Sequence, residues 1–404
     1  MISTHPNKWI RRQRVGIGAV AVVLILIAVW VAVRHHTLPT AHALTSSLAN
    51  DQASIRRTAE PVVRSTTAPN VSGLWARPSA EVASRNRRRS TFAWIMRLLG
   101  ATESQLDRLT SGDALAVVTE LKEKAKGGDP ASIHVLGQLT FLNCRWGPRL
   151  ATFKTRQIAD AQASMLSQMD RDWFTSTVND DLAFDKQLAT ICDHVIDPNE
   201  VLEWVKARAN IGDGASLWLL SGSGSDTESQ QQRLREASDA GFSQAQYDLA
   251  LSINRGEPGA AGSGVNKLDS RELLNQSESA IPGSKVELAV CEYFGECEGI
   301  PIDIDSAIAH AREAAQDGYF SAILRIGPHL PAGQMDPNEV AAWGLIDASV
   351  EQQGCGGGIF TVRAMQNIMG TLNAPNVTAE SRALAEHFWS VYGSQIKANL
   401  GCGL

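Results

Sequence analysis

The chain has 404 residues, of which 44% are hydrophobic and 20% charged, so it can hold two or three domains or one long repeat array. Residues 1–100 contain 14 Lys and Arg against 3 Asp and Glu, a net charge of +11. Residues 101–404 contain 23 against 40, a net charge of −17, which returns the overall charge of −6. An acidic main part argues against nucleic acid as a partner, because phosphate binding needs a basic surface.

The first distinctive segment is residues 15–33, an uncharged apolar run of 19 residues. At about 1.5 Å of rise per residue it nearly matches a bilayer core of roughly 30 Å, which predicts a transmembrane helix. Lys and Arg are concentrated before the run, so the positive-inside rule predicts that residues 1–14 stay in the cytoplasm. We expect a single-pass protein of the cell inner membrane with its main part in the periplasm. The alternative is a cleaved signal peptide, because residues 41–43 (Ala-His-Ala) resemble a cleavage site.

The next segment, residues 34–90, is rich in Ser, Thr, Ala and Pro and has little apolar periodicity. Such a segment buries too little apolar surface to offset the entropy lost on ordering, which predicts a flexible linker. It ends in a basic cluster, residues 85–89. We interpret this cluster as solvated; the alternative is a contact with anionic lipid, wall polymer or an acidic partner.

Residues 91–404 are helical in pattern and contain a repeat. Residues 235–245 align without a gap on residues 312–322, an offset of 77 that corresponds to about two helical hairpins. This repetition predicts an all-α fold, an α/α solenoid of helical hairpin repeats with an insertion at about 144–192. The transmembrane helix and the linker would precede this solenoid.

Two positions recur within the repeated segment. Gly241 and Gly318 each follow a first helix, where glycine takes a left-handed conformation without steric cost. Ala245 and Ala322 begin the second helix, where a small side chain lets two helices approach closely. We expect these four residues to set the turn and the packing of the hairpins.

All six cysteines follow the apolar run, on the side that we expect to be exported, which predicts disulfides. Six cysteines allow 15 pairings, and we favour the sequential one. A metal site is the alternative, but no two cysteines have the CxxC spacing of zinc ribbons. The expected pairs are Cys144 with Cys192, Cys291 with Cys297, and Cys355 with Cys402.

In these residues the chain resembles the Sel-one-like repeat family, relatives of the tetratricopeptide repeat. The closest match is residues 240–249 (AGFSQAQYDL), and residues 295–303 (GECEGIPID) are similar to the loop between repeats of that family. The resemblance implies an exported binding protein whose disulfides staple helix pairs. It transfers no catalytic residue and no cofactor.

The sequence contains no strong catalytic or metal-binding motif, so we expect neither catalysis, nor a cofactor, nor a metal. The adjacent acids Asp180 and Asp181 would suit glycoside hydrolysis if they flanked a bond, but a solvated acidic face explains them better. The same holds for Glu292 and Glu296.

For binding, we single out Trp146 and Trp173, which lie in the insertion and are candidates to line a partner surface. The leading hypothesis is a membrane-anchored periplasmic scaffold that binds protein partners or a cell-wall polymer through the concave face of the solenoid. The alternative is a cell-wall hydrolase with carboxylates in the solenoid groove. A redox protein is disfavoured by the cysteine spacings.

Overall fold

The structure of the protein is a computed structural model. It describes residues 72–222, 227–257, 260, 269–297, 299–356, 361–374 and 377–402. Over these residues the regular structure is helical throughout, and the only β contact is an isolated bridge between Ala332 and Met335. The all-α class predicted from the sequence is therefore confirmed for the described part of the chain.

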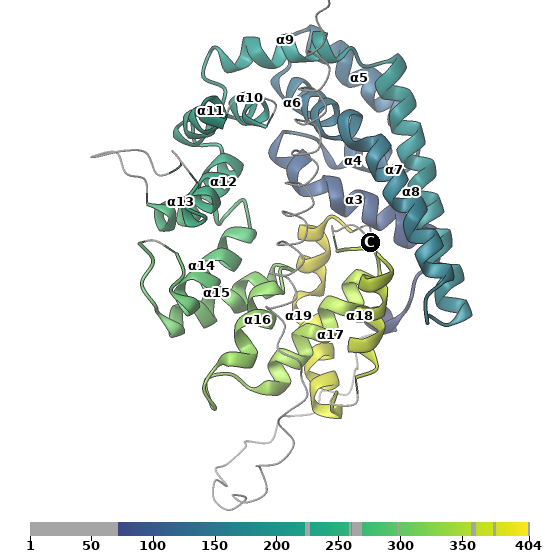
Figure 1. The fold of residues 1–404 in the computed structure, drawn as a ribbon, viewed down its shortest axis with the longest axis vertical. Helices are drawn as coiled ribbons and strands as arrows, with labels where there is room; N and C mark the ends of the chain where they lie inside the picture. The colour runs from purple at the N-terminus through teal and green to yellow at the C-terminus, as the bar shows by residue number, and fades with distance from the viewer. Residues whose placement is uncertain are drawn as a thin grey trace, which may run out of the picture. The chain divides into compact units, whose positions relative to one another are not determined.

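The helices follow one another with short connections (Figure 1). The first half comprises α2 (Ser72–Trp75), α3 (Ala80–Leu98), α4 (Glu103–Thr110), α5 (Ala114–Lys126), α6 (Pro130–Gln138), the π-helix η1 (Leu139–Cys144), α7 (Arg145–Gln162), α8 (Gln168–His194), α9 (Pro198–Ala209) and α10 (Gly214–Ser221). The second half comprises α11 (Thr227–Asp239), α12 (Ser243–Asn254), α13 (Ser270–Ser277), α14 (Gly283–Phe294), α15 (Ile304–Gln316), α16 (Ser321–Ile326), the 3₁₀ helix η3 (Gly327–His329), α17 (Pro337–Gln352), α18 (Val362–Leu372) and α19 (Ala379–Leu400).

The helices from α9 to α16 form consecutive hairpins, each helix packing against its neighbours in the chain. Helices that do not follow one another in the chain also pack together: α10 packs against α6 and α12, and α14 packs against α16. Helix α12 reaches α14 through Tyr247, whose hydroxyl lies beside Gly283. We call α10, α12, α14 and α16 the second helices. This is the repeat organisation that the alignment of residues 235–245 with 312–322 predicted.

Local sequence explains where the hairpins begin and turn. The side chains of Asp197 and Asp336 accept hydrogen bonds from the backbone at the starts of α9 and α17, each followed by proline in the first turn. Gly241 and Gly318 have φ of 81° and 96°, the left-handed region that favours glycine. The repeat alanines at 245 and 322 are fully buried at the helix contacts.

The predicted insertion is a long helical hairpin, α7 and α8, added to the array (Figure 1). The disulfide between Cys144 and Cys192 closes its base, and α8 packs against α3. The other two disulfides join Cys291 to Cys297 and Cys355 to Cys402, so the sequential pairing is confirmed.

The predicted linker is wrong at its C-terminal end, because residues 80–90 belong to α3. The basic cluster is likewise not a solvated end, since Arg87 is only 6% exposed. The composition of this segment suggested too little apolar surface for folding, but polar contacts hold it in place. Ser84 donates to Asp181 over 2.5 Å, and Asn86 donates to the carbonyl of Gln353 over 3.0 Å. Residues 34–71 lie outside the described residues.

The predicted inner-membrane location is not borne out. Among the helices from Ser72 onward that the structure describes, none is long and apolar enough to cross a bilayer. The expected span, residues 15–33, lies outside the described residues, as do residues 1–14. We therefore withdraw the prediction of a single-pass inner-membrane protein.

Candidate functional site

The second helices carry one residue each at the same position of the repeat. The position precedes a buried leucine or isoleucine (Leu219, Leu249, Leu288 and Ile326) and follows by three residues a buried alanine or serine at the start of the helix. Because these helices lie side by side, equivalent positions come next to one another across the array. We call this set the repeat row; its members are Trp218 of α10, Asp248 of α12, Glu287 of α14 and Arg325 of α16.

Hydrogen bonds connect the first two members of the repeat row. The indole Nε1 of Trp218 donates to Oδ2 of Asp248 over 2.7 Å. The amide Nε2 of Gln244 donates to the other oxygen of Asp248, also over 2.7 Å. Burial raises the pKa of Asp248, and these two hydrogen bonds act against that rise. The carboxyl is thus held in place by neutral donors, without a cation beside it in any described ion pair.

Glu287 is the third member, and it has no hydrogen bond or ion pair with any residue that the structure describes. Burial raises its pKa, while the positive charges of Arg325 and Arg255 act in the opposite direction. The hydroxyl of Tyr247 is close by: its pKa is raised by burial and then by the charges of Glu287 and Asp248. Two desolvated carboxyls and a phenol therefore lie together on α12 and α14.

Glycine at the start of α14 makes room for this arrangement. A Cβ atom added to Gly283 would lie 3.2 Å from Oη of Tyr247, closer than most such contacts. The tyrosine ring can therefore lie across the start of α14, one turn before Glu287. Titratable groups with perturbed pKa values cluster at functional sites, which makes the repeat row our first candidate.

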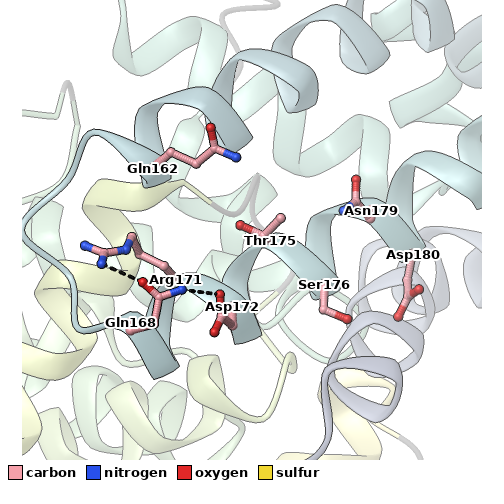
Figure 2. A pocket seen from close by; sticks show the side chains of 8 residues that line it. All are labelled: Gln162, Gln168, Arg171, Asp172, Thr175, Ser176, Asn179 and Asp180. Carbon is pink, nitrogen blue, oxygen red and sulfur yellow. Dashed lines mark hydrogen bonds between the residues drawn. The ribbon is translucent and has the colours of Figure 1, made fainter.

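A second candidate is a polar cavity of about 600 Å³ on the insertion hairpin. On α8 its lining forms two adjacent lines at four-residue spacing, and Gln162 of α7 completes it (Figure 2). Figure 2 shows Thr175 and Asn179 on the side toward Gln162 and Ser176 and Asp180 pointing the other way. The lining residues on α8 are Gln168, Arg171, Asp172, Thr175, Ser176, Asn179 and Asp180.

This cavity has no aromatic or aliphatic side chain in its lining. Ligand sites in proteins are lined mostly by apolar and aromatic groups, with a few polar groups to orient the ligand. The arrangement therefore matches the solvated face of a long helix, whose opposite face is buried through residues such as Phe174 and Val178. We do not assign a ligand to it.

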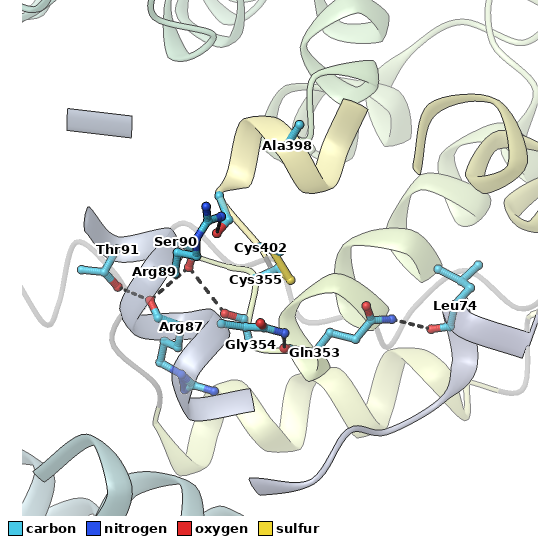
Figure 3. The surroundings of a disulfide bond; sticks show 12 residues. Leu74, Arg87, Arg89, Ser90, Thr91, Gln353, Gly354, Cys355, Ala398 and Cys402 are labelled. Carbon is cyan, nitrogen blue, oxygen red and sulfur yellow. Dashed lines mark hydrogen bonds between the residues drawn. A yellow bond between two sulfur atoms is a disulfide. The ribbon is translucent and has the colours of Figure 1, made fainter. Parts of the chain in front are cut away.

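A third polar region surrounds α3 and the Cys355–Cys402 disulfide (Figure 3). Nη1 of Arg89 donates to the carbonyl of Gly401 over 2.9 Å, and Oγ of Ser90 donates to the carbonyl of Gly354 over 3.4 Å. Both carbonyls are next to the disulfide in the chain. The bridge thus holds two acceptors in position for α3.

Ion pairs line the cavity beside this region, which measures about 950 Å³ between α3, α4 and α19. Arg89 pairs with Glu103 and Asp107, each over 2.7 Å, and Arg97 pairs with Glu103 over 2.6 Å. Because Arg89 and Arg97 pair with Glu103 and Asp107 within the chain, we interpret this region as the attachment of α3 to both ends of the array.

Of the two tryptophans predicted to bind a partner, Trp173 has a described side chain. Trp173 donates from Nε1 to the carbonyl of Pro78 over 2.9 Å, and the guanidinium of Arg77 lies 5.4 Å from the centre of its ring. It therefore holds the segment before α3. The side chain of Trp146 lies outside the part that the structure describes.

The two pairs of carboxylates considered for glycoside hydrolysis, Asp180 with Asp181 and Glu292 with Glu296, do not face a common site. Asp181 is buried and accepts from Ser84, with Arg88 3.8 Å away, whereas Asp180 lines the polar cavity. Glu292 is fully buried on α14, where Arg271 and His310 bind its two oxygens over 3.0 and 2.8 Å. Glu296 is exposed, 3.9 Å from Arg325.

Sequence reasoning missed the repeat row, although a signal was present. Extending the alignment of residues 235–245 with 312–322 by three positions pairs Asp248 with Arg325. Two charged residues of opposite sign at an equivalent position suggest a surface facing a partner. Only the packing of the second helices showed that this position forms one row across the hairpins.

Comparison with known proteins gives little further guidance. No protein-family profile matches the chain, and no curated protein matches it. One solved structure that resembles it is described as a protective antigen present in uropathogenic Escherichia coli strains displaying an SLR fold. The two share 16% identity over 73% of this chain and 71% of that chain, with a TM-score of 0.39.

Proposed function

We propose that this protein is a binding scaffold that presents the repeat row to an extended partner chain. The observation that supports this most directly is the placement of Trp218, Asp248, Glu287 and Arg325 at one repeat position, with Glu287 unpaired among the described residues. A row of single residues on successive hairpins suits a ligand that runs across the hairpins. A peptide suits it better than a neutral glycan, because the row contains charges of both signs.

Photo-crosslinking in the native cell tests the proposal. A photoreactive amino acid replaces Arg325, which is 56% exposed on α16, and in a control strain replaces Glu203, which is 70% exposed on α9. We expect adducts with a second protein from position 325 and few or none from position 203. Equal adduct formation at both positions, or none at 325, would contradict a binding surface on the second helices.

A further inference from the structure

Hydrogen-bond capacity at the centre of the repeat row is unbalanced. The carboxylates of Asp248 and Glu287 together offer about eight acceptor positions, and among the described residues only Trp218 and Gln244 donate to them. Gln244 adds a further acceptor, because its Oε1 is buried without a partner while the residue is only 5% exposed. The site therefore lacks donors, and a ligand that brings donors would satisfy it.

Charge points to the same class of ligand. Burial disfavours the ionised forms of Asp248 and Glu287, so a positive charge brought beside either carboxyl would favour its ionised form. The charge of Arg255 acts on both carboxyls in this direction, but the described ion pair of Arg255 is with Glu257, at 3.7 Å. The partly buried ring of Trp218, which packs against Phe242 with 5.5 Å between centroids, lies beside Asp248 and is an aromatic group of the kind that attracts a guanidinium.

We propose that Asp248 and Glu287 form a recognition site for the guanidinium or ammonium groups of arginine or lysine side chains in an extended peptide. This inference rests on the proposed binding function and specifies the chemistry of its ligand. Arg325, at the end of the row, would face an acidic side chain of the same peptide. Neighbouring helices are about 8 to 10 Å apart and an extended chain rises about 3.3 Å per residue, so contacting residues would be about three apart.

Fluorescence anisotropy with labelled nonapeptides tests the site on the full chain. One peptide carries two arginines three residues apart and a glutamate three residues further on; in the matched peptide citrulline replaces both arginines. Citrulline keeps the shape of arginine and removes its charge. We expect the arginine peptide to bind at least about tenfold more tightly, in line with the energies of close charge pairs.

Matched variants locate the effect. Glu287→Gln keeps the size of the side chain and Asp248→Asn keeps an acceptor for Trp218, so both should fold, which thermal melts would check. Each should weaken binding of the arginine peptide about tenfold and leave the citrulline peptide unchanged. Glu203→Gln, on α9 outside the row, should change neither affinity.

The outcomes separate this inference from the proposed function. If both peptides bind equally, or if Glu287→Gln leaves the arginine peptide unaffected while position 325 still crosslinks to a partner, the cation site is wrong and the scaffold stands. If neither peptide binds with a Kd of about 1 mM or tighter, the cation site is overturned. If crosslinking at position 325 also fails, the proposed function is overturned with it.

Discussion

At the scale of single residues, buried acids fall into two kinds in this protein. Glu292 is fully buried but bound by Arg271 and His310, so its charge is satisfied inside the chain. Asp248 and Glu287 are less buried and form no ion pair among the described residues; Asp248 accepts hydrogen bonds from two neutral donors, whereas Glu287 accepts none. Since a desolvated carboxyl without a partner lowers stability, the position of Glu287 needs a reason, and ligand binding supplies one.

Asp347 on α17 gives a prediction for pH dependence. Burial, and then the neighbouring carboxyl of Glu351, raise the pKa of Asp347 from 3.8 to about 7. Between these values the folded chain keeps a proton that the unfolded chain has released. The free energy of unfolding should therefore fall as pH rises through this window, and the loss should be complete above it.

The substitution Asp347→Asn should remove this dependence. We expect the variant to be more stable than the parent near pH 8, by up to about 4 kcal/mol, and about equal to it near pH 4. Urea unfolding at both pH values measures the two differences. A stability difference that is the same at both pH values would show that Asp347 does not titrate in this window.

At the scale of helices, α3 is the element that the sequence described least well. Its composition resembles a disordered linker, and its arginines resemble a solvated cluster. The structure satisfies them instead, through carbonyls beside the Cys355–Cys402 disulfide and through acids on α4 and α8. Composition could not reveal this, because every one of these partners is distant from α3 in the chain or belongs to another helix.

A pair of glycine substitutions tests how α3 is attached. Gly354 and Gly241 both have φ of 81°, so alanine brings the same backbone strain to each, about 1 kcal/mol. At Gly354 the new Cβ would lie 2.0 Å from the carbonyl oxygen of Ala83 on α3, whereas at Gly241 it meets nothing within 4 Å. We expect Gly354→Ala to cost about 1 to 3 kcal/mol more than Gly241→Ala.

Denaturant unfolding of the two variants gives the comparison, and hydrogen exchange should show faster opening of α3 only in Gly354→Ala. Equal destabilisation of both variants, with α3 equally protected, would mean that α3 does not pack against the loop before Cys355 as described.

Other elements followed closely from the sequence. The repetition at 235 and 312 predicted the hairpins and their turns, because glycine and alanine have strict local roles there. Cysteine order predicted the disulfides, since each pair joins segments that the hairpins bring together. The functional candidates did not follow, because Trp218 and Glu287 become neighbours of Asp248 only through the packing of successive helices. Trp146 and Trp173 lie in the insertion, outside the aligned repeats, so no repeated position indicated which residues would surround them.

At the scale of the whole molecule, the described residues from 72 to 402 form one array of hairpins, with a helical insertion between α6 and α9 and with α3 packed against both α4 and α19. The acidic balance of residues 101–404 favours basic partners over the whole surface, and the repeat row gives that preference a location. Binding should therefore depend on how many hairpins a ligand spans. A site confined to one hairpin would not show this dependence.

The most direct test is a length series of arginine-containing peptides, measured by anisotropy against the full chain. Four row positions are separated by three steps of about 8 to 10 Å, which an extended peptide of about eight residues spans. Affinity should rise as the peptide lengthens from three to about eight residues and then level off, and Glu287→Gln should lower it at every length that reaches α14. If the tripeptide binds as tightly as the longest peptide, the hairpins do not act as one binding surface and the central claim is wrong.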